Sequence, residues 1–288
     1  ILFIGFDGES WDQIGSSSFA FNLINNNFKV FNGLTKNIQW VEIGPLGLYT
    51  DTYYIHTDPT TYKQNDVKTA IDQLTSSITN KLTALGLKTV SVSSQLQNQP
   101  LPPSSLNKIL QSGLIVPGVY LSDYLSSFSN KFYHGIFDDA SNINIDSKKD
   151  LSTAEVIGRL TNVSTSLLRV LQDLAGSSSQ ETLLETNIKD VIYYFYILVT
   201  SLADCFLSNY TCEDFSRIEA IKTMTRTKCQ KFNLSLDSSA LKRDTMSINT
   251  KYSYTDILAK YIAYQMGSKF DKSSEECKYK VFQRLETT

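Results

Sequence analysis

The sequence predicts an α/β fold in which a mixed, mainly parallel sheet is flanked by helices and followed by a helical C-terminal half. Two observations favour this fold class. Over residues 1–149, short apolar runs alternate with helical patterns, the rhythm of a layered α/β protein. Over residues 150–288, apolar residues recur mainly at helical spacing. We expect these two stretches to be the sheet-rich and the helical, cysteine-bearing parts of a single lobe.

Five short runs have the composition of strands. The first is continuously apolar, which is typical of a central strand covered on both faces. The third is rich in Thr and Tyr, which favour strands. The predicted strands are residues 1–6, 38–43, 46–55, 89–92 and 114–121.

Three helices are predicted between these strands. The first follows a run of serines and ends in three asparagines. The second has an apolar stripe at three- and four-residue spacing and is followed by Gly86, a residue type that ends helices in the left-handed conformation. A Pro-rich loop leads into the third, and Gly113 ends it. The predicted helices are residues 16–26, 67–85 and 105–111.

The pattern changes after Asp150, and we place the seam between the two parts near residues 145–152. Ser152 and Glu155 form a capping box, which predicts a helix start. The aromatic run at 193–196 is expected in the core, partly at a contact between lobes, with an exposed interface as the alternative. Helices are predicted over residues 152–174, 187–207 and 255–266.

The charge balance excludes several classes of partner. Lys and Arg number 27 against 29 Asp and Glu, so nothing favours nucleic acid or an anionic membrane surface as a partner. No run reaches the ~20 apolar residues that span a bilayer. The nearest, residues 191–203, is expected to be a buried helix. We expect a soluble fragment that starts without Met inside a strand, with an N-terminal part supplied separately.

Cysteines and sequons favour the secretory pathway. The four cysteines form no C-x-x-C or Cys/His cluster, so disulfides are a better account than a zinc finger. Cys205 and Cys212 lie seven residues apart, and Cys229 and Cys277 could close a longer loop, with the pairing left open. N-x-[ST] sequons predict glycosylation at Asn162, Asn209 and Asn233.

Residues 8–17 read GESWDQIGSS and directly follow the first apolar run. They resemble the G-E-E-x-G-x-x-G-S signature of co-catalytic zinc aminopeptidases, where the first Glu is the general base and the second ligates zinc. Glu9 keeps the first acid, but Ser10 replaces the second, and a neutral hydroxyl is a poor zinc ligand. The alternative interpretation is an ordinary strand-to-helix turn.

Two further positions correspond to metal ligands of that family. Glu42, in the sequence QWVEIG, stands where the family has an Asp ligand, and its longer side chain would displace the metal. His134, in the sequence YHGIFD, matches the spacing of the distal ligand and is either a relic ligand or an ordinary half-buried histidine. With Ser10 these are vestigial metal-site positions, and we expect no bound metal and no cofactor.

Four motifs in one order resemble the nicastrin family, whose large lobe is aminopeptidase-like. Besides GESWDQIGSS they are HTDP at 56–59, QPLPPSSL at 99–106, and the stretch from NKFY to NIN at 130–145. The likeness covers residues 3–145. Beyond residue 150 it consists of the helical pattern, the sequons and the late cysteines.

This resemblance implies a noncatalytic, single-span glycoprotein subunit of γ-secretase, alongside presenilin and two smaller multi-pass subunits. Its ectodomain would lie on the lumenal or extracellular side and select shed stubs of type I membrane proteins, by holding the free amino terminus or by sterically blocking long ectodomains. Carried over by motif, Glu9 would face the substrate amine, with Asp12 and Gln13 in the same crevice. Gln13 stands where the family has Tyr, so one aromatic wall of that pocket is missing.

Two other functions stay open. An active zinc-dependent aminopeptidase would use Glu9 as its base and Glu42 and His134 as ligands. A purely structural lobe would bind nothing in the crevice, and Glu9 would then be a helix N-terminal charge or the partner of a lysine. The HTDP motif is read as a structural turn with Asp58 fixed before its proline, because no G-x-S-x-G motif accompanies it.

Overall fold

The computed structural model describes most of residues 2–208, together with 212–214. The described ranges are 2–6, 8–25, 27, 38–48, 50, 52–92, 99–133, 137–140, 142–143, 145, 150–175, 185–208 and 212–214. The chain forms two compact units, residues 1–200 and 201–288.

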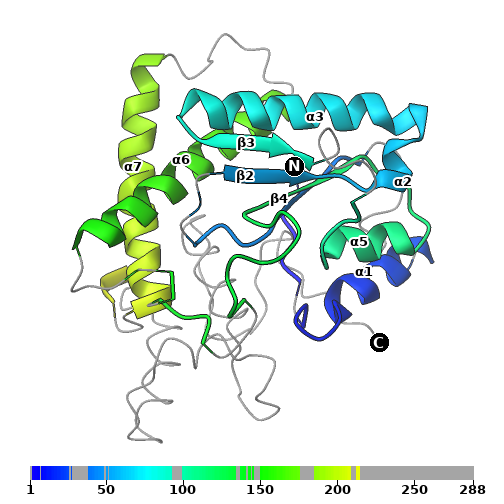
Figure 1. The fold of residues 1–288 in the computed structure, drawn as a ribbon, viewed down its shortest axis with the longest axis horizontal. Coiled ribbons are helices and arrows are strands. Elements are labelled where there is room, and N and C mark those ends of the chain that lie inside the picture. The colour runs from blue at the N-terminus through cyan, green and yellow to red at the C-terminus, as the bar shows by residue number, and fades with distance from the viewer. Residues whose placement is uncertain are drawn as a thin grey trace, which may run out of the picture. The chain divides into compact units, whose positions relative to one another are not determined.

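A four-stranded sheet forms the centre of the first unit (Figure 1). Its strands are β1 (Trp40–Ile43), β2 (Thr52–His56), β3 (Lys88–Ser91) and β4 (Gly118–Ser122), in the order β1-β4-β2-β3. β1 pairs with β4 and β2 with β3 in parallel, whereas β2 and β4 run antiparallel. The predicted α/β class with a mixed, mainly parallel sheet is therefore confirmed.

The prediction of a central strand at the start of the chain was wrong for the residues that the structure describes. Residues 2–6 form no strand. Phe6 packs against Phe19 and Trp40, with ring centroids 5.4 and 6.2 Å away, whereas Phe3 is 80% exposed. A continuous apolar run indicates burial but names no pairing partner. Here aromatic packing half-buries Phe6, at one end of the run, without a strand ladder.

Helices α1 (Ile14–Ile24) and α5 (Ser105–Gln111) cover one face of the sheet (Figure 1). α5 has the predicted bounds, because Ser104 caps it by accepting a hydrogen bond from Asn107 N at 3.1 Å. The core on this face consists of Phe19, Ala20, Leu23, Leu101, Leu106, Ile109, Val116 and Tyr120.

Helices α3 (Asn65–Ala84) and α6 (Asp150–Leu174) share the core on the other face. α3 carries the predicted stripe, and its buried residues are Val67, Ile71, Leu74, Ile78 and Leu82. Val163 and Val170 of α6 join them together with Tyr53, Ile55, Val119 and Leu121 of the sheet. The sheet is therefore the middle of three layers.

The C-terminal end of α3 confirms the predicted role of Gly86. Its φ of 78° is left-handed. Gly86 N donates to Thr83 O at 2.9 Å, and Leu87 N donates to Leu82 O at 3.1 Å. This is the double hydrogen bond of a Schellman motif, which turns the chain directly into β3.

Helix α6 begins two residues earlier than the capping box predicts. It starts at Asp150, so Ser152 and Glu155 lie inside the helix rather than at its entrance. The box was wrong because Ser and Glu three residues apart also occur in a continuing helical turn, where no end is required.

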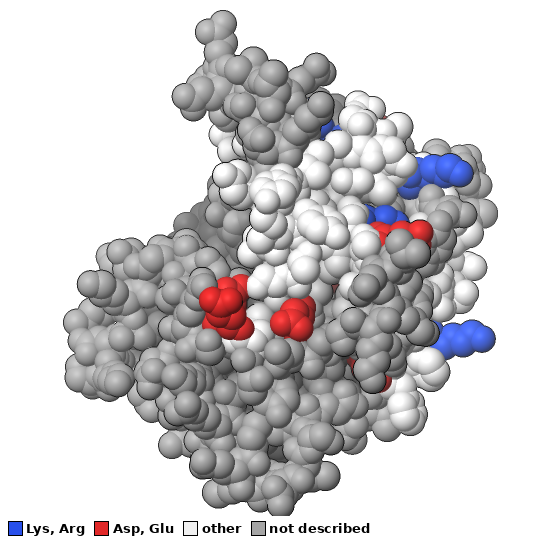
Figure 2. All heavy atoms as spheres, turned by 90° about the vertical axis from the view of Figure 1, so that its left-hand side faces the viewer, with Lys and Arg blue, Asp and Glu red and all other residues white. Residues whose placement is uncertain are grey.

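Helix α7 (Glu185–Ala203) matches the predicted helix at 187–207 but not its predicted burial. Tyr193 and Tyr194 are 63% and 69% exposed, so the core assignment of the aromatic run was wrong for these two residues. Figure 2 shows that the side of the molecule carrying α6 and α7 has a broad uncharged area with charged residues at its margins. Among the described residues, no helix is both long and apolar enough to cross a membrane.

The described part of the second unit is short and held by a disulfide. Cys205 and Cys212 are bonded, which confirms one of the two expected pairs, and Ser201 Oγ donates to the Asp214 carboxylate. A π-helix, η2 (Asp204–Ser208), follows α7. The other predictions for this region lie outside the described residues: Cys229, Cys277, Asn209, Asn233 and the helix at 255–266.

A candidate site of two helix-capping acids

Glu9 lies in the turn before α1 and its carboxylate is held by three donors. Gly8 opens this turn with a φ of 73°. Glu9 Oε1 accepts a hydrogen bond from Ser16 N at 2.8 Å. Oε2 accepts from Ser16 Oγ at 2.8 Å and from Ser105 Oγ at 2.6 Å. Because Ser16 N belongs to the first turn of α1, Glu9 satisfies a helix donor that has no intrahelical partner.

Glu42 does the same for α5. It is the third residue of β1, and its Oε1 and Oε2 accept from Ser105 N at 2.9 Å and Leu106 N at 2.6 Å. Burial raises the pKa of Glu42, the two backbone donors oppose this rise, and the negative charge of Glu9 adds to it. The two acids therefore lie within each other's field.

Ser105 joins the two acids. Its backbone N–H donates to Glu42 and its hydroxyl donates to Glu9. The QPLPPSSL motif thus has a local function that the sequence did not reveal: Ser104 caps α5, and Ser105 connects that helix to both carboxylates. Ser16 and Ser105 are the residues of this site that sequence reasoning missed. The sequence feature that could have indicated them is the pair of serines in each motif, GESWDQIGSS and QPLPPSSL.

A buried phenol, Tyr120, and a half-buried one, Tyr133, lie in the field of Glu42. The pKa of Tyr120 is raised, first by burial, and burial together with the charge of Glu42 raises the pKa of Tyr133 to about 12. Both phenols therefore stay protonated at neutral pH. The Tyr120 hydroxyl lies against the backbone of Gly44, where any added Cβ would overlap it.

The remaining predicted crevice residues face outward. Ser10 is exposed and Gln13 is half-buried. The Asp12 carboxylate is 87% exposed and forms an ion pair of 3.0 Å with Lys108 Nζ. Asp12 and Gln13 have φ values of 55° and 53°, a left-handed pair that costs backbone energy in residues other than glycine. The turn thus places Asp12 beside α5.

The described residues do not fit the zinc pair of an aminopeptidase. Both oxygens of Glu42 are engaged by backbone N–H groups, and Glu9 is engaged by three donors. Ser10 is an exposed hydroxyl. His134, the third vestigial position, lies outside the described residues. Positive helix ends and hydroxyls surround the two carboxylates here, so their negative charge is compensated by the fold.

The HTDP motif is a structural turn, as predicted. Asp58 caps α2 (Pro59–Tyr62), accepting from Thr61 N at 2.6 Å and from Thr61 Oγ1 at 2.8 Å. His56 is 1% exposed and lies between the rings of Tyr120 and Tyr124, with centroids 6.1 and 5.5 Å away. The hydrogen bonds described for His56 and Asp58 go to Tyr124 O and to Thr61, so they indicate a structural turn rather than a catalytic triad.

The NKFY-to-NIN motif also organises a loop. Asn130 is 5% exposed, and its Nδ2 donates to Asp138 Oδ1 at 2.8 Å. Its Oδ1 accepts from Asn142 Nδ2 at 2.7 Å and from Phe132 N at 3.0 Å. This network folds the loop that brings Tyr133 close to Glu42.

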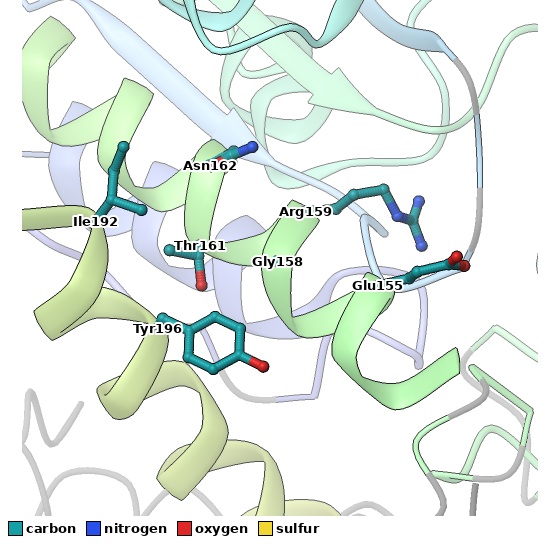
Figure 3. A pocket seen from close by; sticks show the side chains of 7 residues that line it. All are labelled: Glu155, Gly158, Arg159, Thr161, Asn162, Ile192 and Tyr196. Carbon is teal, nitrogen blue, oxygen red and sulfur yellow. The ribbon is translucent and has the colours of Figure 1, made fainter. Parts of the chain in front are cut away.

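One surface pocket lies on the side of the sheet that carries α6, away from the acids. Its volume is about 410 Å³, and it lies between α6 and α7, as shown in Figure 3. It is lined by Glu155, Gly158, Arg159, Thr161, Asn162, Ile192 and Tyr196. Asn162, a predicted glycosylation site, is half-buried there, and its Nδ2 donates to Leu85 O at 3.4 Å.

Comparison with known proteins identifies relatives of this chain. The profile of the family described as Nicastrin large lobe matches residues 1–171. Mouse Nicastrin is 33% identical over 205 residues, covering 68% of this chain and 28% of the mouse protein. Human Nicastrin is 32% identical over 204 residues, and Arabidopsis thaliana Nicastrin is 29% identical over 169 residues.

A crystal structure of the gamma-secretase component Nicastrin aligns with 73% of this chain and 36% of its own, at 23% identity and a TM-score of 0.46. The chain spans 28% of the length of the mouse and human relatives that it matches.

Proposed function

The chain belongs to the Nicastrin large-lobe family, and from that premise we propose that it is the C-terminal part of a noncatalytic ectodomain lobe serving γ-secretase as a scaffold and substrate-recruiting subunit. Its partners would then be presenilin, the two smaller multi-pass subunits and the N-terminal part of the same ectodomain. Stubs of type I membrane proteins would be the substrates. The lobe would lie on the lumenal or extracellular side of the membrane.

The observation that carries the noncatalytic assignment is the engagement of both oxygens of Glu42 by the N-terminus of α5. A metal ligand must direct its lone pairs at the ion. Glu42 instead directs both oxygens at α5, and α1 and Ser105 take three of the acceptor positions of Glu9. This arrangement supports a scaffold function for the former peptidase residues.

Substrate recruitment by Glu9 is compatible with the same geometry. A carboxylate offers about four acceptor positions. Glu9 uses three of them. One position therefore remains for the α-ammonium group of a stub, which would form a charge-assisted hydrogen bond. The exposed Asp12 and the half-buried Gln13 lie on the same turn and would extend the contact.

The test compares capture of a stub with a free amino terminus and of the same stub N-acetylated, by the full-length protein in its assembled complex. Glu9→Gln is expected to weaken capture of the free-amine stub about tenfold, or about 1.4 kcal/mol, because the charge is lost. Capture of the acetylated stub should not change. Glu155→Gln, which alters an exposed acid of α6, serves as the matched control.

A second variant separates charge from structure. Ser105→Ala removes one hydrogen bond to Glu9 but keeps the carboxylate, so it should leave capture of the free-amine stub largely intact. Equal capture by wild type and Glu9→Gln, with assembly preserved, would support a purely structural lobe or a steric barrier. Stoichiometric zinc together with turnover of an aminoacyl chromogenic substrate would establish the active zinc-dependent aminopeptidase instead.

A further inference from the structure

Two buried titratable side chains lie where β4 ends: Asp123 carries one, and the other, His56, contacts Tyr124. Asp123 and Tyr124 follow the last strand residue, Ser122. Asp123 N donates to Pro45 O at 3.0 Å, and Tyr124 N donates to Ser122 Oγ at 3.1 Å. From this point the chain leaves the sheet and continues to Tyr133, which lies in the field of Glu42 and Glu9.

The Asp123 carboxyl is buried, and no other described residue donates a hydrogen bond to it. It is 2% exposed. Four charged or titratable groups interact with its charge: Arg159 of α6, Tyr53 of β2, Tyr120 of β4 and Tyr133. Burial raises the pKa of Asp123 to about 6, although its own backbone N–H and the positive charge of Arg159 oppose this rise.

His56 holds the next residue. It is 1% exposed, and its Nε2 lies 2.6 Å from Tyr124 O. Because a carbonyl only accepts, Nε2 carries the proton and the neutral ring leaves Nδ1 bare. Nδ1 is buried and has no partner among the described residues. The His56 ring packs against the rings of Tyr120 and Tyr124. Burial lowers the pKa of His56.

We propose that the protonation of Asp123 and the protonation of His56 act in opposite directions on the start of the 123–133 segment, so that this segment stays fixed to the sheet between neutral and mildly acidic pH. The His56 ring contacts Tyr124 O, and the buried Asp123 carboxyl belongs to the preceding residue. Protonation removes a buried negative charge from Asp123, but it adds a buried N–H without an acceptor to His56. Protonation at Asp123 therefore favours the closed segment, whereas protonation at His56 disfavours it.

The pKa shifts of Asp123 and His56 act on the segment in opposite directions as the pH changes. Asp123 has a raised folded-state pKa, so its ionised form disfavours the closed segment above pH 6, and closing improves as the pH falls toward 3.8. His56 has a lowered folded-state pKa, so its contribution to the stability of the closed segment is fully present above pH 6.5 and falls progressively below it, as a second buried N–H becomes necessary. Between pH 7.5 and 5 the two effects therefore oppose each other.

Hydrogen exchange of the complete polypeptide, followed by mass spectrometry over residues 124–133 from pH 5 to 7.5, tests this pair. Rates are corrected with an unstructured peptide of the same sequence. His56→Gln keeps a donor toward Tyr124 O but does not titrate. In this variant, protection should be about tenfold greater at pH 5 than at pH 7.5, the change expected for one acid shifted from 3.8 to about 6.

Asp123→Asn should show the opposite slope, with protection falling as the pH drops below 6.5, because the His56 response is then unopposed. The wild-type slope should lie between those of the two variants. Asp66→Asn, an exposed acid of α3, should reproduce the wild-type profile. Profiles of both variants parallel to wild type would overturn the proposal. This outcome is independent of whether Glu9 binds a substrate amine, because neither variant alters the Glu9 hydrogen bonds.

Discussion

Glu42 connects a strand to a helix that lies far away in the sequence. It lies on β1, where a metal ligand is expected by family resemblance, yet it caps a helix that begins 63 residues later. Glu42 accepts hydrogen bonds from the backbone N–H groups of Ser105 and Leu106, and these two groups have no partner within the helix. The acid therefore ties β1 to α5, and its removal should be felt as lost stability.

Glu42→Ala should destabilise the protein by about 1–2 kcal/mol, the range measured for removal of a helix cap. The physical reason is the exposure of two unpaired donors at the start of α5. Urea unfolding followed by tryptophan fluorescence would measure it, because Trp40 lies two residues away on β1. Glu155→Ala on the exposed side of α6 should change stability by less than about 0.5 kcal/mol. Equal stability of Glu42→Ala and wild type would contradict the capping function.

At the scale of elements, local sequence features specify α3: an apolar stripe along one face and a glycine at its C-terminal end. Its five buried residues recur at helical spacing, and Gly86 ends it in the left-handed conformation. Gly158 lies inside α6, in an ordinary helical conformation. A Cβ added at either glycine would meet nothing within 4 Å. The two positions therefore differ in backbone conformation rather than in space.

Gly86→Ala should destabilise the protein by about 1–2 kcal/mol, since a side chain disfavours the left-handed conformation. Gly158→Ala should instead stabilise it by about 0.5–1 kcal/mol, because alanine is the better helix former. Thermal unfolding of the two variants beside wild type measures both effects. The same sign for both substitutions would show that the Schellman end of α3 contributes little.

Sequence reasoning was most successful where a signal is local. The bounds of α5, the glycine end of α3 and the Asp58 turn all rest on residues within a few positions of one another. It failed where the partner is distant. The Glu42–Ser105 pairing spans 63 residues, and no local pattern indicates it.

Burial was also harder to predict than helix formation. The apolar run at residues 2–6 carries the composition of a strand, but Phe3 is exposed and Phe6 is only half-buried, by packing against Phe19 and Trp40. Tyr193 and Tyr194 belong to a correctly predicted helix, yet they face outward. Composition reports what a segment can bury, whereas the neighbours that bury it come from elsewhere in the chain.

At the scale of the whole molecule, the cysteines and tryptophans are divided between the two units. All four cysteines lie in residues 201–288, and both tryptophans lie in residues 1–200. The Cys205–Cys212 bond closes a short loop after α7. Reduction therefore acts on one unit, while tryptophan fluorescence reports on the other.

Reducing agent should destabilise the second unit by about 2–3 kcal/mol, the chain-entropy value for a loop of this size. The unfolding midpoint seen by tryptophan fluorescence should stay unchanged, because the first unit contains no cysteine. Limited proteolysis with and without reductant, with cleavage sites mapped by mass spectrometry, would show new cuts beyond residue 200. New cuts within α3 would contradict this independence.

The contact between Gly44 and the Tyr120 hydroxyl has a consequence for how the family can vary. The phenol occupies the space that any β-carbon at position 44 would need. A larger residue at 44 is therefore compatible with this sheet only if position 120 shrinks at the same time. A larger residue at 44 should therefore have been accepted in evolution only together with a smaller residue at 120, and a lineage in which position 44 alone grew must have moved the Tyr120 ring or spread β1 and β4 apart.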